Sequence, residues 1–109
     1  MKTGRALVEE IEGLELEPGS LAFWWLGQLG YAIKIGQTVL YIDPFLTPSP
    51  FRSVPPLLEP SDVTNADWVL GTHDHGDHID RHSLPGIMRA SPQARFVCSR
   101  VARPHVLGL

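Results

Sequence analysis

The segment from Thr72 to Asp80, with the sequence THDHGDHID, places the strongest constraint on this chain. Three of the five histidines lie within it, interleaved with carboxylates. Imidazole and carboxylate groups are ligands for zinc and other divalent ions. In an extended backbone, side chains two residues apart project to the same side. We therefore expect His73 and His75 to bind one metal ion together.

The second half of this segment supplies two further ligand types. Gly76 can adopt a positive φ at little cost, which would turn the chain and direct Asp77 and His78 at a second point. Two metals about 4 Å apart are used by hydrolases to hold and activate a water. A solvated loop ending in a helix cap at Asp80 is the alternative. The apolar residues 68–70 place the segment at a strand end, where binding and catalytic residues concentrate, and this favours a metal site.

Composition and charge exclude several classes of protein. Hydrophobic residues make up 43% of the chain and charged residues 19%, which is ordinary for a globular protein. The net charge of −3 gives no basic surface for nucleic acid. No apolar run is long enough for a membrane span, and the N-terminal residues do not resemble a secretory signal. The single cysteine, Cys98, fits a reducing compartment, so we expect a cytoplasmic protein.

The hydrophobic pattern predicts a mixed α/β (α+β) fold. Ala6, Leu7, Val8 and Ile11 have helical spacing. Three adjacent apolar runs joined by short turns predict an antiparallel meander. The predicted helices span 5–12, a segment that begins near Ser83, and 99–107 with an interruption at Pro104; the predicted strands span 21–26, 31–35, 39–42, 67–70 and 94–98.

Residues 44–60 form a predicted loop. Six of the ten prolines of the chain lie in this range, and proline lacks the backbone donor that a sheet or helix interior requires. A loop of this length inside a compact domain is usually functional or disordered. It either edges the active-site cleft or is a surface excursion, and the sequence does not decide between them.

The motif His-x-His-x-Asp-His after a short apolar strand resembles the signature of the metallo-β-lactamase-fold hydrolases. Residues 22–27, Gly30, residues 9–12 and the Pro18-Gly19 turn resemble, more closely, the L-ascorbate-6-phosphate lactonase branch. This similarity covers most of the chain and about the first third of a family member. It implies the N-terminal portion of an αββα sandwich, mainly the first sheet with its helices. Residues 1–109 would then be one partial domain.

The resemblance also implies the chemistry of the site. His73 and His75 would bind one divalent ion, Asp77 and His78 a second, and Asp77 would also move protons. Zinc fits the nitrogen-rich ligands, and manganese is compatible with the carboxylates. Such metals lower the pKa of bound water and polarise the carbonyl that it attacks. The expected substrate is a small molecule, a sugar-acid lactone such as L-ascorbate 6-phosphate.

Residues outside the motif have supporting roles in this interpretation. By resemblance, Asp43 at the end of the third strand supports the metal loop by holding its ligands, the alternative being a turn before Pro44. Asp74 could support the loop or cap it. Gln28 stands where many relatives have histidine, and we expect it on the substrate side of the site.

The remaining candidate residues are expected to be structural. His82 and His105 lie outside the motif and are expected on helix surfaces or partly buried. Cys98 is expected in the core. Trp24 and Trp25 are expected in the core as well, with a substrate wall as the alternative.

Ligand number limits what this chain can do. A catalytic metal normally has three protein ligands plus water, so four ligands shared between two metals leave each site short. By resemblance the missing ligands lie downstream. We therefore expect a fragment that is inactive alone and that self-associates through uncovered apolar surface. Two other functions remain open: a non-enzymatic metal-binding or interaction fragment, and a metallo-β-lactamase-fold nuclease, against which the acidic charge counts.

Overall fold

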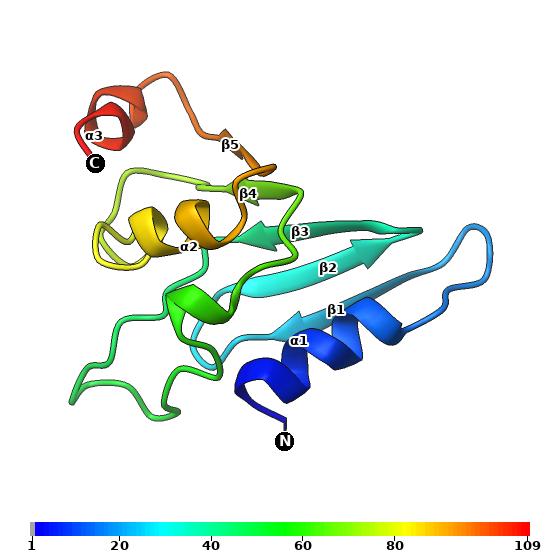
Figure 1. The fold of residues 1–109 in the computed structure, drawn as a ribbon. Helices are drawn as coiled ribbons and strands as arrows, with labels where there is room; N and C mark the ends of the chain where they lie inside the picture. The colour runs from blue at the N-terminus through cyan, green and yellow to red at the C-terminus, as the bar shows by residue number, and fades with distance from the viewer. Residues whose placement is uncertain (1) are drawn as a thin grey trace.

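One five-stranded sheet, with its strands in chain order, forms the centre of the molecule (Figure 1). The structure is a computed structural model and describes residues 2–109. The first three strands pair antiparallel and the last three pair parallel. The mixed α/β fold and the meander are therefore confirmed. The strands are β1 (Leu21–Trp25), β2 (Tyr31–Ile35), β3 (Thr38–Ile42), β4 (Trp68–Leu70) and β5 (Arg95–Val97).

The parallel pairing of β3, β4 and β5 brings the predicted site residues together. The carboxyl ends of parallel neighbours lie at the same edge of a sheet. Asp43 follows β3 and Gly71 follows β4, and the backbone N of Asp43 donates a hydrogen bond to the carbonyl of Leu70 at 2.8 Å. The segment after β4 thus begins beside Asp43, although 28 residues separate Asp43 from Gly71 along the chain.

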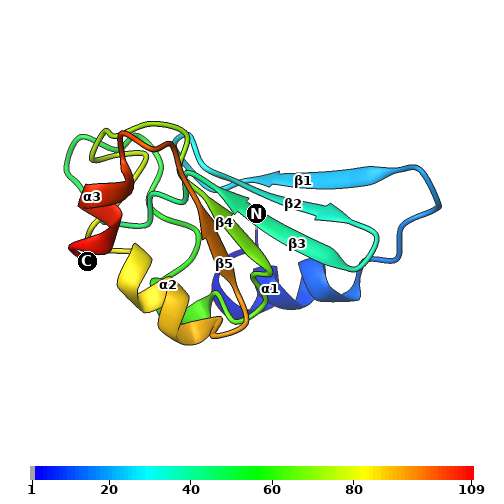
Figure 2. The ribbon, with the colours of Figure 1, turned by 90° about the horizontal axis from the view of Figure 1, so that it is seen from above.

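Two helices cover one face of the sheet. α1 (Gly4–Gly13) and α2 (Leu84–Ala90) lie on the same side of it (Figure 2). α1 buries Leu7, Val8 and Ile11, whereas Ala6 is exposed and does not belong to the buried stripe expected of it. Ile87 of α2 is fully buried, as its spacing predicts.

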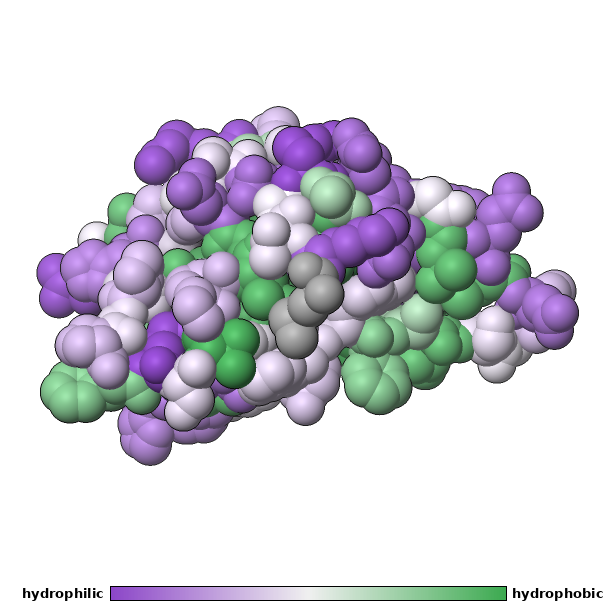
Figure 3. All heavy atoms as spheres, turned by 90° about the horizontal axis from the view of Figure 1, so that it is seen from below, coloured by the Kyte–Doolittle hydropathy of each residue, from purple (hydrophilic) through white to green (hydrophobic). Residues whose placement is uncertain are grey.

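The opposite face of the sheet is apolar, and no helix in residues 2–109 covers it (Figure 2). β1 shows strict alternation, with Leu21, Phe23 and Trp25 exposed at 56%, 65% and 40%. The cross-strand register places their partners on the same face. In the view from below, hydrophobic side chains are open to solvent along the lower part of the molecule, on the side of the sheet away from the helices (Figure 3). The apolar side chains of this open sheet face are Leu21, Phe23, Trp25, Tyr31, Ile33, Ile35, Leu40, Ile42, Trp68, Leu70 and Val97.

A buried lysine on β2 binds the carbonyl groups at the C-terminal end of α1. Lys34 points from β2 toward the helices and is 2% exposed. Its Nζ donates to the carbonyls of Ile11, Glu12 and Leu14 at 2.7, 2.9 and 2.7 Å. The last carbonyls of a helix have no partner within the helix and carry partial negative charge, so an ammonium group stabilises them. The sequence did not predict this role, because a lysine in a strand usually faces water.

Replacing Lys34 with Met is expected to lower the free energy of unfolding by about 2 kcal/mol, because three carbonyls lose their charged donor. Chemical denaturation followed by circular dichroism measures the change. Lys2→Met is the matched control, since Lys2 is exposed and its ion pair with Glu10 is 3.4 Å long. An equal effect of the two substitutions would show that the Lys34 bonds contribute nothing.

The C-terminal region differs from the prediction. α3 (Arg103–Leu107) is shorter than the helix expected over 99–107, and residues 99–102 are not helical. Pro104 does not interrupt this helix; it lies in its first turn, where its missing donor is not needed. Gly108 occupies the C-cap position with a φ of −77°, so it does not use the left-handed conformation typical of a terminal glycine.

The two ends of the proline-rich segment 44–60 pack onto the body of the protein, whereas its middle projects from it and leaves Phe51 94% exposed (Figure 1). Leu46, Leu57 and Leu58 are buried in the core. The segment leads into η1 (Pro60–Asp62), where the Asp62 carboxylate accepts a hydrogen bond from the backbone N of Glu59 at 2.8 Å. Within residues 2–109, no helix has the length and apolar character needed to cross a bilayer.

Candidate functional site

The histidine-rich segment forms a tight loop directly after β4. The backbone N of His75 donates to the carbonyl of His73 at 2.9 Å, and the N of His78 donates to the carbonyl of His75 at 3.0 Å. The predicted extended backbone at His73–His75 is therefore wrong, and Gly76 does not adopt a positive φ. The side chain of Ile79 is fully buried, so its insertion into the core draws the chain into a turn that the residue spacing alone did not reveal.

The loop nevertheless brings its three imidazole rings together. The ring centroids of His73 and His78 are 3.8 Å apart, and those of His73 and His75 are 4.5 Å apart. The centroids of His75 and His78 are 6.4 Å apart. The Asp77 carboxylate lies 3.7 Å from Nε2 of His78 and is 44% exposed. All four ligands expected from the sequence thus lie within one small region at the rim of the sheet.

The side chain of Asp43 is bonded to two residues of this loop, Thr72 and His78. It is 5% exposed and has a φ of +48°, a conformation that aspartate adopts more readily than most residues. Its carboxylate accepts hydrogen bonds from the backbone N and Oγ1 of Thr72, at 2.7 and 2.5 Å. It also contacts Nδ1 of His78 at 2.7 Å.

The contact between Asp43 and His78 determines which ring nitrogen of His78 carries the proton. A carboxylate accepts hydrogen bonds, so Nδ1 of His78 carries the proton. In the neutral imidazole the other nitrogen, Nε2, is then a free electron-pair donor, and it faces the Asp77 side. A carboxylate in this position orients a metal-binding histidine and raises its basicity.

The side chains of this loop are of the types that bind divalent ions, but they are not arranged around one common position. Three imidazoles and a carboxylate are suitable ligands for zinc. Manganese is also compatible with carboxylate ligands. In residues 2–109, however, no three His, Cys, Asp or Glu side chains are arranged to hold one ion between them. The rings of His73, His75 and His78 lie against one another, so rotations of their side chains would be needed to point their nitrogens at one ion.

Asp80 is a structural residue of the site that the sequence analysis treated only as a helix cap. It is 1% exposed and accepts hydrogen bonds from Oγ1 of Thr47 at 2.6 Å and from the hydroxyl of Ser83. The Ser83 hydroxyl also accepts from the backbone N of Leu46 at 3.2 Å. These bonds attach the proline-rich segment to the end of the metal loop.

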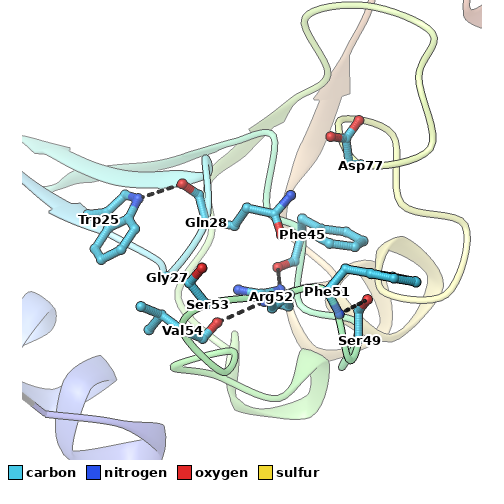
Figure 4. A pocket seen from close by; sticks show the side chains of 10 residues that line it. All are labelled: Trp25, Gly27, Gln28, Phe45, Ser49, Phe51, Arg52, Ser53, Val54 and Asp77. Atoms are coloured by element: carbon cyan, nitrogen blue, oxygen red, sulfur yellow. Dashed lines mark hydrogen bonds between the residues drawn. The ribbon is translucent and has the colours of Figure 1, made fainter.

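A pocket lies between the metal loop and the proline-rich segment (Figure 4). Its volume is about 480 Å³. Asp77 borders it on one side and Gln28 on another. The proline-rich segment supplies six of its lining residues, so this segment edges the candidate site. The lining residues are Trp25, Gly27, Gln28, Phe45, Ser49, Phe51, Arg52, Ser53, Val54 and Asp77.

The two adjacent tryptophans have different environments. Trp24 packs against the core and donates through Nε1 to Oε2 of Glu10 at 3.1 Å. Trp25 is 40% exposed, lines the pocket and donates to the carbonyl of Gln28 at 2.8 Å. A core position for Trp25 is therefore wrong, because alternation along β1 turns consecutive side chains to opposite faces.

Gly30 allows the turn between β1 and β2 to pack closely against Asp43, since a Cβ at this position would lie 2.5 Å from the Asp43 carbonyl oxygen.

The remaining histidines lie outside the ligand group. His82 is exposed. His105 is partly exposed, as expected, but its Nδ1 lies 2.6 Å from Oδ1 of Asp74. Asp74 therefore connects the histidine-rich loop to α3, a contact between residues 31 apart that the sequence did not predict.

Several known proteins are similar in sequence to this chain. The chain is 32% identical over 114 residues to the probable L-ascorbate-6-phosphate lactonase UlaG of Escherichia coli O139:H28. The same values hold for the protein of that name from Salmonella paratyphi B. Each match covers 79% of this chain and 32% of the relative. No family model matches the chain. The chain is thus similar to proteins named as lactonases and spans about a third of their length.

Proposed function

We propose that this chain carries metal-binding residues of a metal-dependent hydrolase of the lactonase type. The observation that supports this most directly is the hydrogen bond from His78 Nδ1 to the buried Asp43 carboxylate, which leaves Nε2 of His78 free beside Asp77. A carboxylate that orients a histidine in this way is typical of metal sites. The similarity to proteins named as lactonases agrees with the proposal.

The residues of the loop have distinct roles in this proposal. His73 and His75 hold one divalent ion, and Asp77 and His78 a second. Such ions, when bound, lower the pKa of a water molecule and polarise a carbonyl. Asp77, with its partly exposed carboxylate, accepts and returns the proton of that water. Asp43 fixes the ring of His78, and Asp80 keeps the proline-rich segment against the loop.

The substrate in this proposal is a small molecule that contains a carboxylic ester closed into a ring. Relatives are named for L-ascorbate 6-phosphate, a sugar-acid lactone. The pocket beside Asp77, with a volume of about 480 Å³, has room for a molecule of that size. Gln28 offers a hydrogen-bond donor and an acceptor at its edge.

A second candidate function is a metal-binding or interaction fragment without catalytic activity. Two observations favour it: no three ligands in residues 2–109 are arranged around one point, and the open sheet face is apolar. In this case the chain would bind metal and associate with a partner that supplies further ligands. The two proposals differ in whether a lactone is turned over once the further metal ligands are supplied.

The ligand assignment predicts that His73→Ala or His75→Ala lowers the metal content of the purified chain at least about tenfold, because each removes an imidazole from an already small ligand set. Elemental analysis after loading with zinc or manganese and dialysis measures the content. His82→Ala is the matched control, since His82 is exposed and contacts no ligand. His105 is a poorer control because it pairs with Asp74 in the loop. Equal losses in the His82 variant would overturn the assignment.

The same metal-loaded protein, assayed with a lactone, tests whether the ligands of this chain are sufficient for catalysis. We expect no turnover by the 109-residue chain, since four ligands for two metals leave both short of the usual three. Metal-dependent turnover that Asp77→Asn abolishes would show that this set suffices and would eliminate the non-catalytic candidate.

A further inference from the structure

The C-terminal helix α3 contacts the histidine-rich loop, residues 72–80, through a polar pair of side chains (Figure 1). Nδ1 of His105 lies 2.6 Å from Oδ1 of Asp74. A carboxylate accepts hydrogen bonds, so Nδ1 of His105 is the donor. Asp74 stands between His73 and His75 in the chain, and the bond therefore acts on the backbone that carries both proposed ligands of the first ion.

The middle of this loop has one long-range polar contact. In the described residues 2–109, the bond between Asp74 and His105 is the only side-chain hydrogen bond that joins residues 73–77 to a segment remote in the sequence. The two ends of the loop are fixed separately by the carboxylate of Asp43. The part of the loop that contains the first two histidines therefore depends on α3 for its polar attachment to the rest of the fold.

The helix α3 is held only weakly by its own packing. It has five residues, fewer than an isolated helix needs to be stable in water. None of these residues is buried, and Leu107 is 68% exposed. Val106 packs against the core beside a cavity of about 370 Å³, which is lined by residues of α2, β5 and α3. The hydrogen bond from His105 therefore contributes substantially to holding α3 against the loop.

We infer that His105 is a positioning residue for metal binding, which acts through Asp74 to restrain the backbone between His73 and His75. Metal binding and the docking of α3 then stabilise each other. The inference rests on the proposed function for the assignment of these two histidines as ligands. Their rings lie against each other and must rotate to face one ion, and a restrained backbone lowers the entropy cost of ordering them. An ion that fixes this backbone in turn holds Asp74 within reach of His105, because coupling between two sites is reciprocal.

The test compares the zinc affinity of the whole chain with that of variants, by competition with a coloured chelator. His105→Leu removes the donor and keeps a side chain of similar bulk. We expect it to raise the dissociation constant for zinc at least about fivefold, the lower end of ordinary coupling between sites. His105→Asn places an amide donor close to the position of Nδ1, and we expect it to restore most of the affinity. His82→Leu is the matched control, since His82 is exposed and lies outside the ligand group.

A double-mutant cycle tests whether His105 acts through Asp74. Asp74→Ala alone also removes a negative charge near the ions, so its effect does not isolate the contact. We expect His105→Leu to have no further effect on zinc affinity when Asp74 is already replaced by Ala, because the cycle measures only the interaction of the two residues. Equal effects of His105→Leu with and without Asp74 would show that the contact does not transmit the effect.

Hydrogen exchange of the α3 amides supplies the reciprocal measurement. The backbone N–H groups of Val106 and Gly108 bond to carbonyls of Ala102 and Pro104, so their exchange reports on this helix. We expect zinc to slow their exchange in the native chain but not in Asp74→Ala or His105→Leu. A residue that only stabilised the fold would leave the exchange independent of zinc. Thermal unfolding checks that the metal-free variants are folded, and Asp74→Ala decides if His105→Leu is not.

The outcomes distinguish this inference from the proposed function. Zinc binding that His73→Ala abolishes and His105→Leu leaves unchanged overturns the inference, while the ligand assignment still stands. Zinc binding without slower exchange in α3 overturns it in the same way. A native chain that binds no zinc at the histidine-rich loop overturns both the proposed function and the inference.

Discussion

Replacing Asp43 with Asn is expected to weaken metal binding by about 10–100-fold while the chain stays folded. The substitution removes the negative charge that holds Nδ1 of His78 and both donors of Thr72. An amide can still accept a hydrogen bond through its oxygen, and asparagine tolerates the positive φ of this position. The loss should therefore appear in metal affinity because His78 is no longer fixed in the tautomer that presents Nε2.

Competition with a coloured chelator measures the affinity, and thermal unfolding of the metal-free protein measures the fold. Glu15→Gln is the control, since it removes one carboxylate charge at an exposed position remote from the loop. Asp43→Ala should additionally lower the unfolding temperature, because three donors lose their acceptor in a nearly buried place. If Asp43→Asn binds metal as tightly as the native chain, Asp43 serves only to close the turn before Pro44.

The chain is expected to form dimers or larger assemblies through the open sheet face. Six of its side chains are 39–65% exposed: Leu21, Phe23, Trp25, Tyr31, Ile35 and Val97. At the areas typical of such side chains they offer roughly 600 Å² per copy, approaching what one partner contributes to a stable interface. Two such sheets can stack face to face at the usual spacing of a β-sandwich, about 10 Å. Burial of apolar surface then drives association.

Analytical ultracentrifugation over a range of concentrations tests this expectation. The double substitution Leu21→Asp and Phe23→Asp should shift the chain to monomer, because it places two charges on the apolar face at positions that are already exposed. Val101→Asp is the control: Val101 is 81% exposed but lies outside the sheet. Association through the sheet would be contradicted if the native chain remained monomeric at high concentration. It would also be contradicted if Val101→Asp dissociated the assembly as much as the double substitution does.

The order of elements and the identity of the site segment could be predicted from the sequence. Alternating and helical spacing of apolar residues identified all five strands and placed three helical segments, because these periodicities reflect which side of an element is buried. The run of histidines and aspartates after residues 68–70 predicted a loop at a strand end, and the structure has it there. Local chemistry was sufficient for these conclusions, since each depends on neighbours within a few residues.

The contacts that give the site its geometry came only from the tertiary structure. Parallel pairing of β3 and β4 placed Asp43 under Thr72 and His78, and burial of Ile79 bent a loop that was expected to be extended. Long-range contacts likewise joined Lys34 to α1, Thr47 to Asp80, and His105 to Asp74. The sequence by itself determined which side chains can bind a metal and which segments form the sheet. Only the fold decided which carboxylate holds which histidine and that Arg52 shares a pocket with Asp77, because these pairings depend on how distant segments pack against one another.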